Sequence, residues 1–136
     1  MTIEKEKVNI LVAEDEADLR EILKTILEQQ GYRAILASDG DEAIKKIKKR
    51  SFRIALIDIK MPRVNGRKLA FKIKQINPRL PIVIITGSPD FEEEMSLKKQ
   101  AYEYIYKPFR INELLRVVEG ALRQTGKPEA RAQNQE

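Results

Sequence analysis

Apolar residues along the chain fall either in short continuous runs or at helical spacing. The runs at 8–13, 54–57 and 82–85 show little polar alternation, which is typical of parallel strands covered on both faces. Weaker strand patterns lie at 33–37 and 103–106. Elsewhere apolar residues recur three and four positions apart, which predicts helices. The predicted helices include residues 19–27, 43–47, 69–76, 90–100 and 111–122.

Turn-forming residues separate these elements. Gly31 follows the first helix, Asp39-Gly40 marks a turn, and Asn77-Pro78 ends the third helix. Strands that alternate with helices in this way form a parallel sheet with right-handed crossovers. We therefore predict an α/β fold with a doubly wound, five-stranded parallel sheet and five helices on its two faces. The helix at 90–100 is the least amphipathic and should be the least firmly anchored.

The pattern indicates one domain between two polar ends. All predicted elements lie within 8–123, whereas 1–7 is a polar extension and 124–136 is unpatterned, as in disordered tails. The length of 136 residues, 42% of them hydrophobic, suits a single domain. The polar start lacks the apolar segment of a signal peptide, and no apolar run approaches the roughly 20 residues of a membrane span. We expect a cytoplasmic protein.

Polar residues stand where four of the predicted strands end. Glu14-Asp15-Glu16 follows the first strand, Asp58 ends the third, Thr86 ends the fourth, and Lys107 follows the fifth. The carboxyl ends of parallel strands lie at one edge of the sheet, where ligands bind in such folds. The topology therefore brings carboxylates, a hydroxyl and an ammonium together.

This combination of groups suits metal-assisted phosphoryl chemistry. Clustered carboxylates repel one another, and a divalent cation would relieve that repulsion. Magnesium prefers oxygen ligands, and the absence of histidine and cysteine disfavours softer metals and excludes imidazole or thiolate catalysis. An aspartate can attack phosphorus to form an acyl phosphate, with positive charge from a metal and a lysine stabilising the transferred group.

Four sequence fragments carry a resemblance to a known family. They are VAEDE, IALIDIKMPRVNG, IVIITGSP and YEYIYKPF, in this order and each at a strand end. Together they resemble the receiver domain of bacterial two-component response regulators, in particular the single-domain, chemotaxis-type receivers, over about residues 8–122. The resemblance implies a flavodoxin-like strand order 2-1-3-4-5. It also implies a signalling switch rather than an enzyme in the usual sense, although such a domain catalyses its own phosphoryl transfer and dephosphorylation.

The resemblance also implies roles for individual residues. Asp58 would accept a phosphoryl group from a sensor histidine kinase or a phosphotransfer protein. Asp15 would bind Mg²⁺ directly, Glu14 would bind it through water, and Asp58 and the backbone carbonyl of Lys60 would complete the protein ligands. Glu14 stands where aspartate is commoner, and Lys60 stands at a position that tunes dephosphorylation in the family.

Further implied roles concern the switch and the backbone. Thr86 and Lys107 would contact the phosphoryl group, and Thr86 would act with Tyr104, three residues before Lys107, as the switch pair. The bond before Pro108 would be cis, a geometry that X-Pro bonds allow at low cost. Gly66, which ends the loop after Asp58, would have a structural role. A downstream protein would bind the face formed by residues 90–123.

Basic residues are concentrated in one part of the chain. The net charge is +5, yet the window 45–79 holds thirteen lysines and arginines and a single acid, Asp58. A solvated lysine-rich face explains this window, and so does an acidic partner, which could be a protein, an anionic membrane or a nucleic acid. The window has no aromatic interleaving and no nucleic-acid-binding motif.

Three other functions fit parts of the pattern. A Mg²⁺-dependent phosphatase or hydrolase with an aspartyl nucleophile would share the chemistry, but the haloacid-dehalogenase type needs a DxD motif where this chain has EDE. The chain could also be an isolated receiver fragment of a longer transcriptional regulator. An unphosphorylated interaction module is the third alternative, which the filled chemical positions disfavour.

Overall fold

The computed structural model describes residues 8–60, 65–87, 97 and 100–125. All strand pairings are parallel, and the strand order is β2-β1-β3-β4-β5, so the predicted sheet and its topology are confirmed. The strands are β1 (Asn9–Ala13), β2 (Arg33–Ala37), β3 (Ile54–Asp58), β4 (Ile82–Thr86) and β5 (Ala101–Tyr106).

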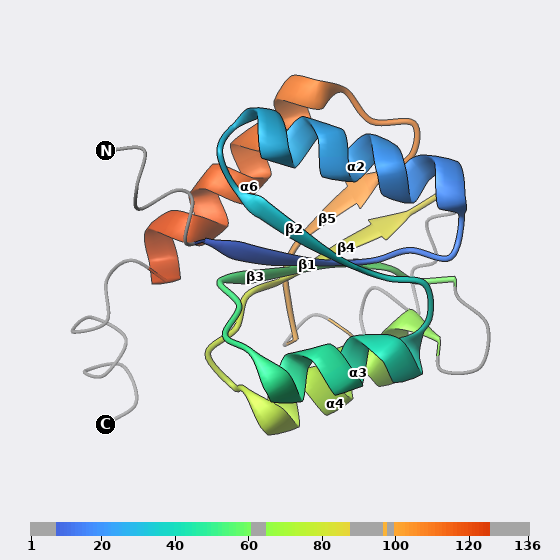
Figure 1. The fold of residues 1–136 in the computed structure, drawn as a ribbon, viewed down its shortest axis with the longest axis vertical. Coiled ribbons are helices and arrows are strands. Elements are labelled where there is room, and N and C mark those ends of the chain that lie inside the picture. Colours follow the sequence, from blue (N-terminus) through green and yellow to red (C-terminus); the bar gives the residue numbers. More distant parts are fainter. Residues whose placement is uncertain (1–7, 61–64, 88–96, 98–99, 126–136) are drawn as a thin grey trace.

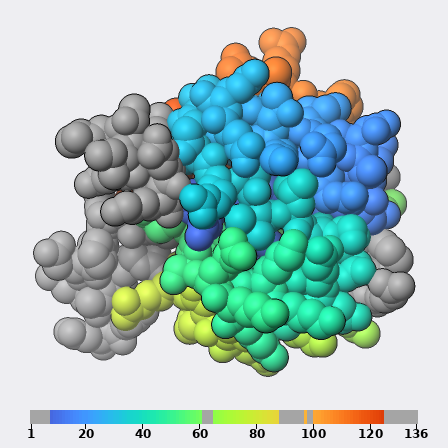
Figure 2. Space-filling model, in the orientation of Figure 1, coloured from blue at the N-terminus to red at the C-terminus, as the bar shows by residue number. Residues whose placement is uncertain are grey.

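Helices cover both faces of the sheet, as predicted. Helices α2 (Ala17–Gln29) and α6 (Ile111–Thr125) lie on one face, and α3 (Gly40–Lys49) and α4 (Gly66–Ile76) lie side by side on the other (Figure 1). In the space-filling view α2 forms the upper part of the visible surface and α3 the lower part (Figure 2). The fifth predicted helix, at 90–100, lies outside the described residues except for its last part, where Leu97 is helical and buried.

Two hydrophobic cores lie above and below the sheet. Leu23 and Val118 belong to the core beneath α2 and α6, and Leu69 belongs to the core beneath α3 and α4. Side chains alternate along a strand, so Leu56 enters the first core and its neighbour Ile57 enters the second. This two-sided burial explains why the central strands are apolar without alternation.

Strand β5 differs most from its predicted bounds, and the reason lies in its pairing with β4. Strand β5 begins at Ala101 rather than at residue 103, because Ala101 pairs with Ile82. The register then shifts, so that Glu103 pairs with Val83 and Tyr102 is left over between the two pairs. Such a bulge depends on the pairing of two strands, and periodicity within one strand does not reveal it.

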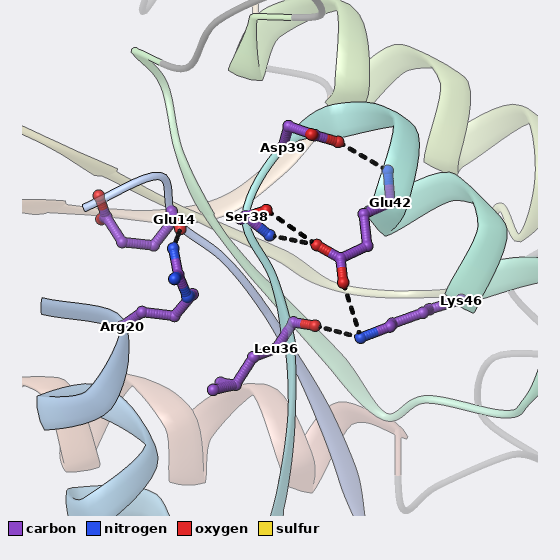
Figure 3. Close-up of polar contacts among 7 residues, drawn as sticks. All are labelled: Glu14, Arg20, Leu36, Ser38, Asp39, Glu42 and Lys46. Atoms are coloured by element: carbon purple, nitrogen blue, oxygen red, sulfur yellow. Dashed lines mark hydrogen bonds and ion pairs between the residues drawn. The ribbon is translucent and has the colours of Figure 1, made fainter. Parts of the chain in front are cut away.

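The start of α3 is tied to the end of β2 by a local polar network (Figure 3). Asp39 caps the helix by accepting a hydrogen bond from the backbone N–H of Glu42 at 2.8 Å. The carboxylate of Glu42 accepts from the backbone N–H of Ser38 at 2.6 Å and forms an ion pair with Lys46 at 3.1 Å. The bond from the Ser38 backbone is the main cause of the lowered pKa of Glu42. The predicted turn at Asp39-Gly40 is therefore a helix cap.

The start of α4 packs closely against the chain that leaves β3. The backbone N–H of Gly66 donates to the carbonyl of Ile59 at 2.9 Å. A Cβ atom at Gly66 would lie 2.4 Å from the Ile59 Cα and 2.6 Å from the Asp58 carbonyl oxygen. Only glycine fits this approach without movement of the backbone beside Asp58, which gives the predicted structural residue Gly66 a physical role.

We expect Gly66→Ala to lower the free energy of unfolding by about 1–3 kcal/mol, because the added methyl group meets backbone atoms that cannot rotate away. Gly87→Ala is the matched control, since among the described residues its Cβ would meet only Lys107 side-chain carbons at 3.7 and 3.8 Å, an ordinary contact. Both substitutions lower unfolded-state entropy alike. Urea unfolding of the two variants measures the difference, and equal stabilities would contradict the account of the close approach.

Candidate functional site

The predicted polar residues meet at one edge of the sheet. Glu14 follows β1, Asp58 ends β3, Thr86 ends β4 and Lys107 follows β5. These four strands are consecutive, hydrogen-bonded neighbours in the sheet. Glu14, Asp58 and Thr86 are 1%, 5% and 2% exposed. In the part of the chain that the structure describes, they are the only buried polar or charged residues. Burial of this kind is costly unless specific partners compensate it.

One ammonium group faces both buried carboxylates. The Nζ of Lys107 lies 3.3 Å from Oδ2 of Asp58 and 3.6 Å from Oε1 of Glu14. Backbone donors hold the other oxygen of each carboxylate. The N–H of Lys60 donates to Oδ1 of Asp58 at 3.2 Å, and the N–H of Glu16 donates to Oε2 of Glu14 at 3.1 Å. Each carboxyl group is thus oriented from two sides.

Glu14 nevertheless remains poorly compensated. Burial is the main cause that raises its pKa to about 7, and the nearby Asp58 raises it further, while the bond from Glu16 and the charge of Lys107 lower it. Its Oε1 is buried and accepts no hydrogen bond from the described residues, because the 3.6 Å separation from Lys107 is too long for one. Two carboxylates therefore share one cation, and a second positive charge at the site would be electrostatically favourable.

A divalent cation fits this deficit. Glu14, Asp15 and Asp58 each offer a carboxylate oxygen, and these oxygens lie within 4.8 Å of one another. Asp15 is exposed, whereas the other two are buried, so the cluster opens to solvent on one side. Hard oxygen ligands with room for water suit Mg²⁺. The predicted fourth ligand, the carbonyl of Lys60, lies two residues after Asp58 and stays a prediction.

Arg20 contributes to the site although the sequence did not indicate it. Its Nη1 donates to the main-chain carbonyl of Glu14 at 2.7 Å (Figure 3). The backbone N–H of Glu14 also donates to the carbonyl of Ala37 on β2 at 3.0 Å. The acidic loop is therefore held from α2 and from β2 at once. The only sequence signal was an arginine one turn into the helix after the acidic triplet, which is common on helix surfaces.

The switch pair predicted from the family lies on β4 and β5. Thr86 pairs in register with Tyr106, and its carbonyl accepts from the N–H of Lys107 at 2.8 Å. Tyr104, opposite Ile84, packs against the core beneath α3 and α4. Its ring stacks on that of Tyr106 with centroids 6.4 Å apart, a contact that the sequence analysis did not foresee.

The peptide bond between Lys107 and Pro108, just after β5, is cis. Lys107 and Pro108 also line an apolar cavity of about 310 Å³, together with Phe109, Ile111 and residues of α2.

None of the described helices is both long and apolar enough to cross a membrane. The structure thus brings Glu14, Asp15, Asp58 and Lys107 together, and places Thr86 and Tyr104 on the two adjoining strands.

Comparisons with solved structures agree with this fold. A response regulator receiver domain protein (CheY-like) from Methanospirillum hungatei is 30% identical, with a TM-score of 0.86 over 89% of this chain and 98% of that chain. The response regulator TrrA from Thermotoga maritima, solved in complex with Mg(2+)-BeF, is 32% identical, with a TM-score of 0.79 over 85% of this chain and 99% of that chain.

Curated relatives and a family model give the same result. The transcriptional regulatory protein ZraR from Klebsiella oxytoca is 33% identical over 121 residues, which are 88% of this chain and 27% of that protein. An uncharacterized transcriptional regulatory protein, YkoG from Bacillus subtilis, is 29% identical over 89% of this chain and 54% of its own length. The chain thus spans about a quarter to a half of these relatives. Since the response regulator receiver domain model matches residues 10–119, the chain belongs to this family of two-component systems.

Proposed function

We propose that the chain is a phosphorylation-activated switch in which Asp58 accepts a phosphoryl group from a sensor histidine kinase or a phosphotransfer protein. The observation that carries the proposal is the placement of Lys107, whose Nζ lies 3.3 Å from Oδ2 of the buried Asp58. The backbone N–H of Lys60 holds Oδ1, so the carboxylate is presented in one orientation. A fixed carboxylate beside a fixed cation suits attack on phosphorus.

The transfer follows from these positions. An oxygen of Asp58 attacks the phosphorus, a new O–P bond forms, and the N–P bond of the donor histidine breaks, leaving its electron pair on the imidazole. Negative charge remains on the other phosphoryl oxygens, and the ammonium of Lys107 stands where it can offset that charge. Mg²⁺ held by Glu14, Asp15 and Asp58 would supply further positive charge to these oxygens. The Mg(2+)-BeF complex of the Thermotoga relative supports metal binding by this chain.

The rival hydrolase function is less well supported. The receiver family is not an enzyme family in the usual sense, and a hydrolase would need a group that activates water for repeated turnover. A receiver that forms part of a longer transcriptional regulator is compatible with the same site, because ZraR and YkoG are transcriptional regulatory proteins longer than this chain. Phosphorylation would then control either an attached output domain or a separate protein.

The signal would leave the site through β4 and β5. A phosphoryl group on Asp58 adds negative charge beside Lys107, whose backbone is bonded to Thr86. A movement of Thr86 would alter the space beside Tyr104, which lies on the adjoining strand and is only partly buried. We infer that Tyr104 changes position and that a downstream partner binds the face formed by residues 90–123, of which the structure describes β5 and α6.

Asp58→Asn should abolish phosphorylation by acetyl phosphate and Mg²⁺, because the amide keeps the shape of the carboxylate but is a poor nucleophile. Lys107→Ala should slow the reaction by roughly 10²-fold, as removal of one charge-stabilising donor typically does. Intact-protein mass spectrometry measures the added phosphoryl group. Asp41→Asn, an exposed carboxylate in the first turn of α3, is the control. Undiminished phosphorylation of the Asp58→Asn protein would refute the assignment.

Beryllofluoride with Mg²⁺ should shift amide NMR signals mainly between residues 86 and 112, with a smaller set between 58 and 66. The reason is that charge added at Asp58 reaches Thr86 and Tyr104 through Lys107. Thr86→Ala should shrink the shifts on β5 while leaving those near Asp58. Shifts confined to α3 and α4, with Tyr104 unaffected, would instead exclude the proposed output face.

A further inference from the structure

The outward sides of α3 and α4 together form a surface dominated by lysine and arginine. We call it the basic face. The two helices lie side by side over the sheet. Lys46 and Lys74 on these helices are half-buried and bonded to other residues, whereas seven further cations, on the helices or just after α3, are exposed. None of these seven cations has a hydrogen-bond or ion-pair partner among the described residues. The basic face consists of Lys45, Lys48, Lys49, Arg50, Arg67, Lys68 and Lys72.

Helix stability explains the cations of α3 but not those of α4. Helix α3 has acids in its first turn and lysines in its last, the arrangement that the helix dipole favours. Helix α4 has no acid in its first turn and carries Arg67 and Lys68 there, where the dipole is unfavourable for positive charge. These two residues therefore cost helix stability, and an anionic partner outside the chain would compensate that cost.

Two large apolar side chains lie among these cations. Phe71 and Ile76 on α4 are each 41% exposed. Phe71 follows Lys68 by three positions, and Ile76 follows Lys72 by four, so each apolar side chain lies beside a lysine on the helix surface. Cations around exposed aromatic and aliphatic groups are typical of helices that lie in a membrane interface. The phosphate backbone of a nucleic-acid duplex offers no apolar layer for Ile76.

We propose that the basic face binds peripherally to a membrane surface rich in anionic phospholipids. The lysines and arginines attract the lipid phosphates, and Phe71 and Ile76 enter the boundary between headgroups and acyl chains. Helices α3 and α4 cover one face of the sheet, whereas Asp58 lies at the carboxyl edge and α2 and α6 cover the opposite face (Figure 1). The membrane-bound protein therefore keeps its phosphoacceptor edge and its other face accessible, and the binding does not depend on phosphorylation.

The test is co-sedimentation of the full chain with vesicles of phosphatidylcholine alone or of phosphatidylcholine and phosphatidylglycerol in equal parts. We expect binding only to the anionic vesicles and release as salt rises. Each cation near an anionic surface changes partitioning by about fivefold, so removing four should weaken binding by roughly 10²-fold or more. The charge variant combines Lys45→Gln, Lys49→Gln, Lys68→Gln and Lys72→Gln.

A matched control removes the same number of exposed positive charges from elsewhere on the molecule. Its sites lie at the start of β2 and on or just before α6, away from the basic face. Circular dichroism melts establish that both variants fold. The control should keep most of its vesicle binding, because its cations do not reach the bilayer. The control variant combines Arg33→Gln, Arg110→Gln, Arg116→Gln and Arg123→Gln.

A second variant tests the apolar contribution. Phe71→Ser with Ile76→Ser keeps every charge and should bind the anionic vesicles several-fold more weakly. Unchanged binding by this variant would contradict insertion of α4 and overturn the proposal. Equal losses in the charge variant and its control would overturn it too, because net charge alone would then explain the binding. Equal binding to both vesicle types would also overturn the proposal, as would tight binding to a DNA duplex without binding to vesicles.

Discussion

The contact of one lysine with two buried carboxylates is the interaction on which the rest of the site depends. Glu14 and Asp58 are almost fully buried at the carboxyl ends of the neighbouring strands β1 and β3, and Lys107 lies within 3.6 Å of an oxygen of each. Two adjacent carboxylates with one cation leave negative charge uncompensated. The pKa of Glu14 is raised mainly by its burial and further by the nearby Asp58. Additional positive charge would therefore stabilise the two carboxylates, and a Mg²⁺ ion would supply it.

The parallel sheet makes this contact possible. Strands β1 and β3 are neighbours in the sheet although α2, β2 and α3 lie between them in the chain, so Glu14 and Asp58 meet at its edge. Strand β4 separates β3 from β5. Lys107 spans that gap with its long side chain, and the bond from its N–H to the carbonyl of Thr86 fixes its starting point. Gly66 keeps α4 close behind Asp58, and Arg20 fixes the acidic loop. Each support acts on the backbone, so the side chains converge with little freedom.

The sequence predicted the parts of this arrangement that depend on pattern. Apolar runs located the strands, and the residues that end them, such as Asp58 and Lys107, could be placed at one edge because parallel strands share that edge. Features that depend on pairing or on long side chains could not be predicted. The bulge in β5 depends on the register of that strand with β4. The hydrogen bond from Arg20 to the carbonyl of Glu14 depends on the conformation of the arginine side chain. The exposure of Ile76 was not predicted either, because helical spacing placed it on the same apolar side of α4 as the buried residues Leu69 and Ile73.

The most direct test of the account is whether Mg²⁺ stabilises the protein through the acidic cluster. Thermal unfolding with and without Mg²⁺ should show stabilisation of the wild type, by about 2.7 kcal/mol at a hundredfold excess over the dissociation constant. Asp15→Ala should lose most of this gain. Glu16→Ala should keep it, because the Glu16 side chain makes no capping bond and the substitution retains the backbone N–H that donates to Glu14. Equal stabilisation of the two variants by Mg²⁺, or none in the wild type, would contradict the account.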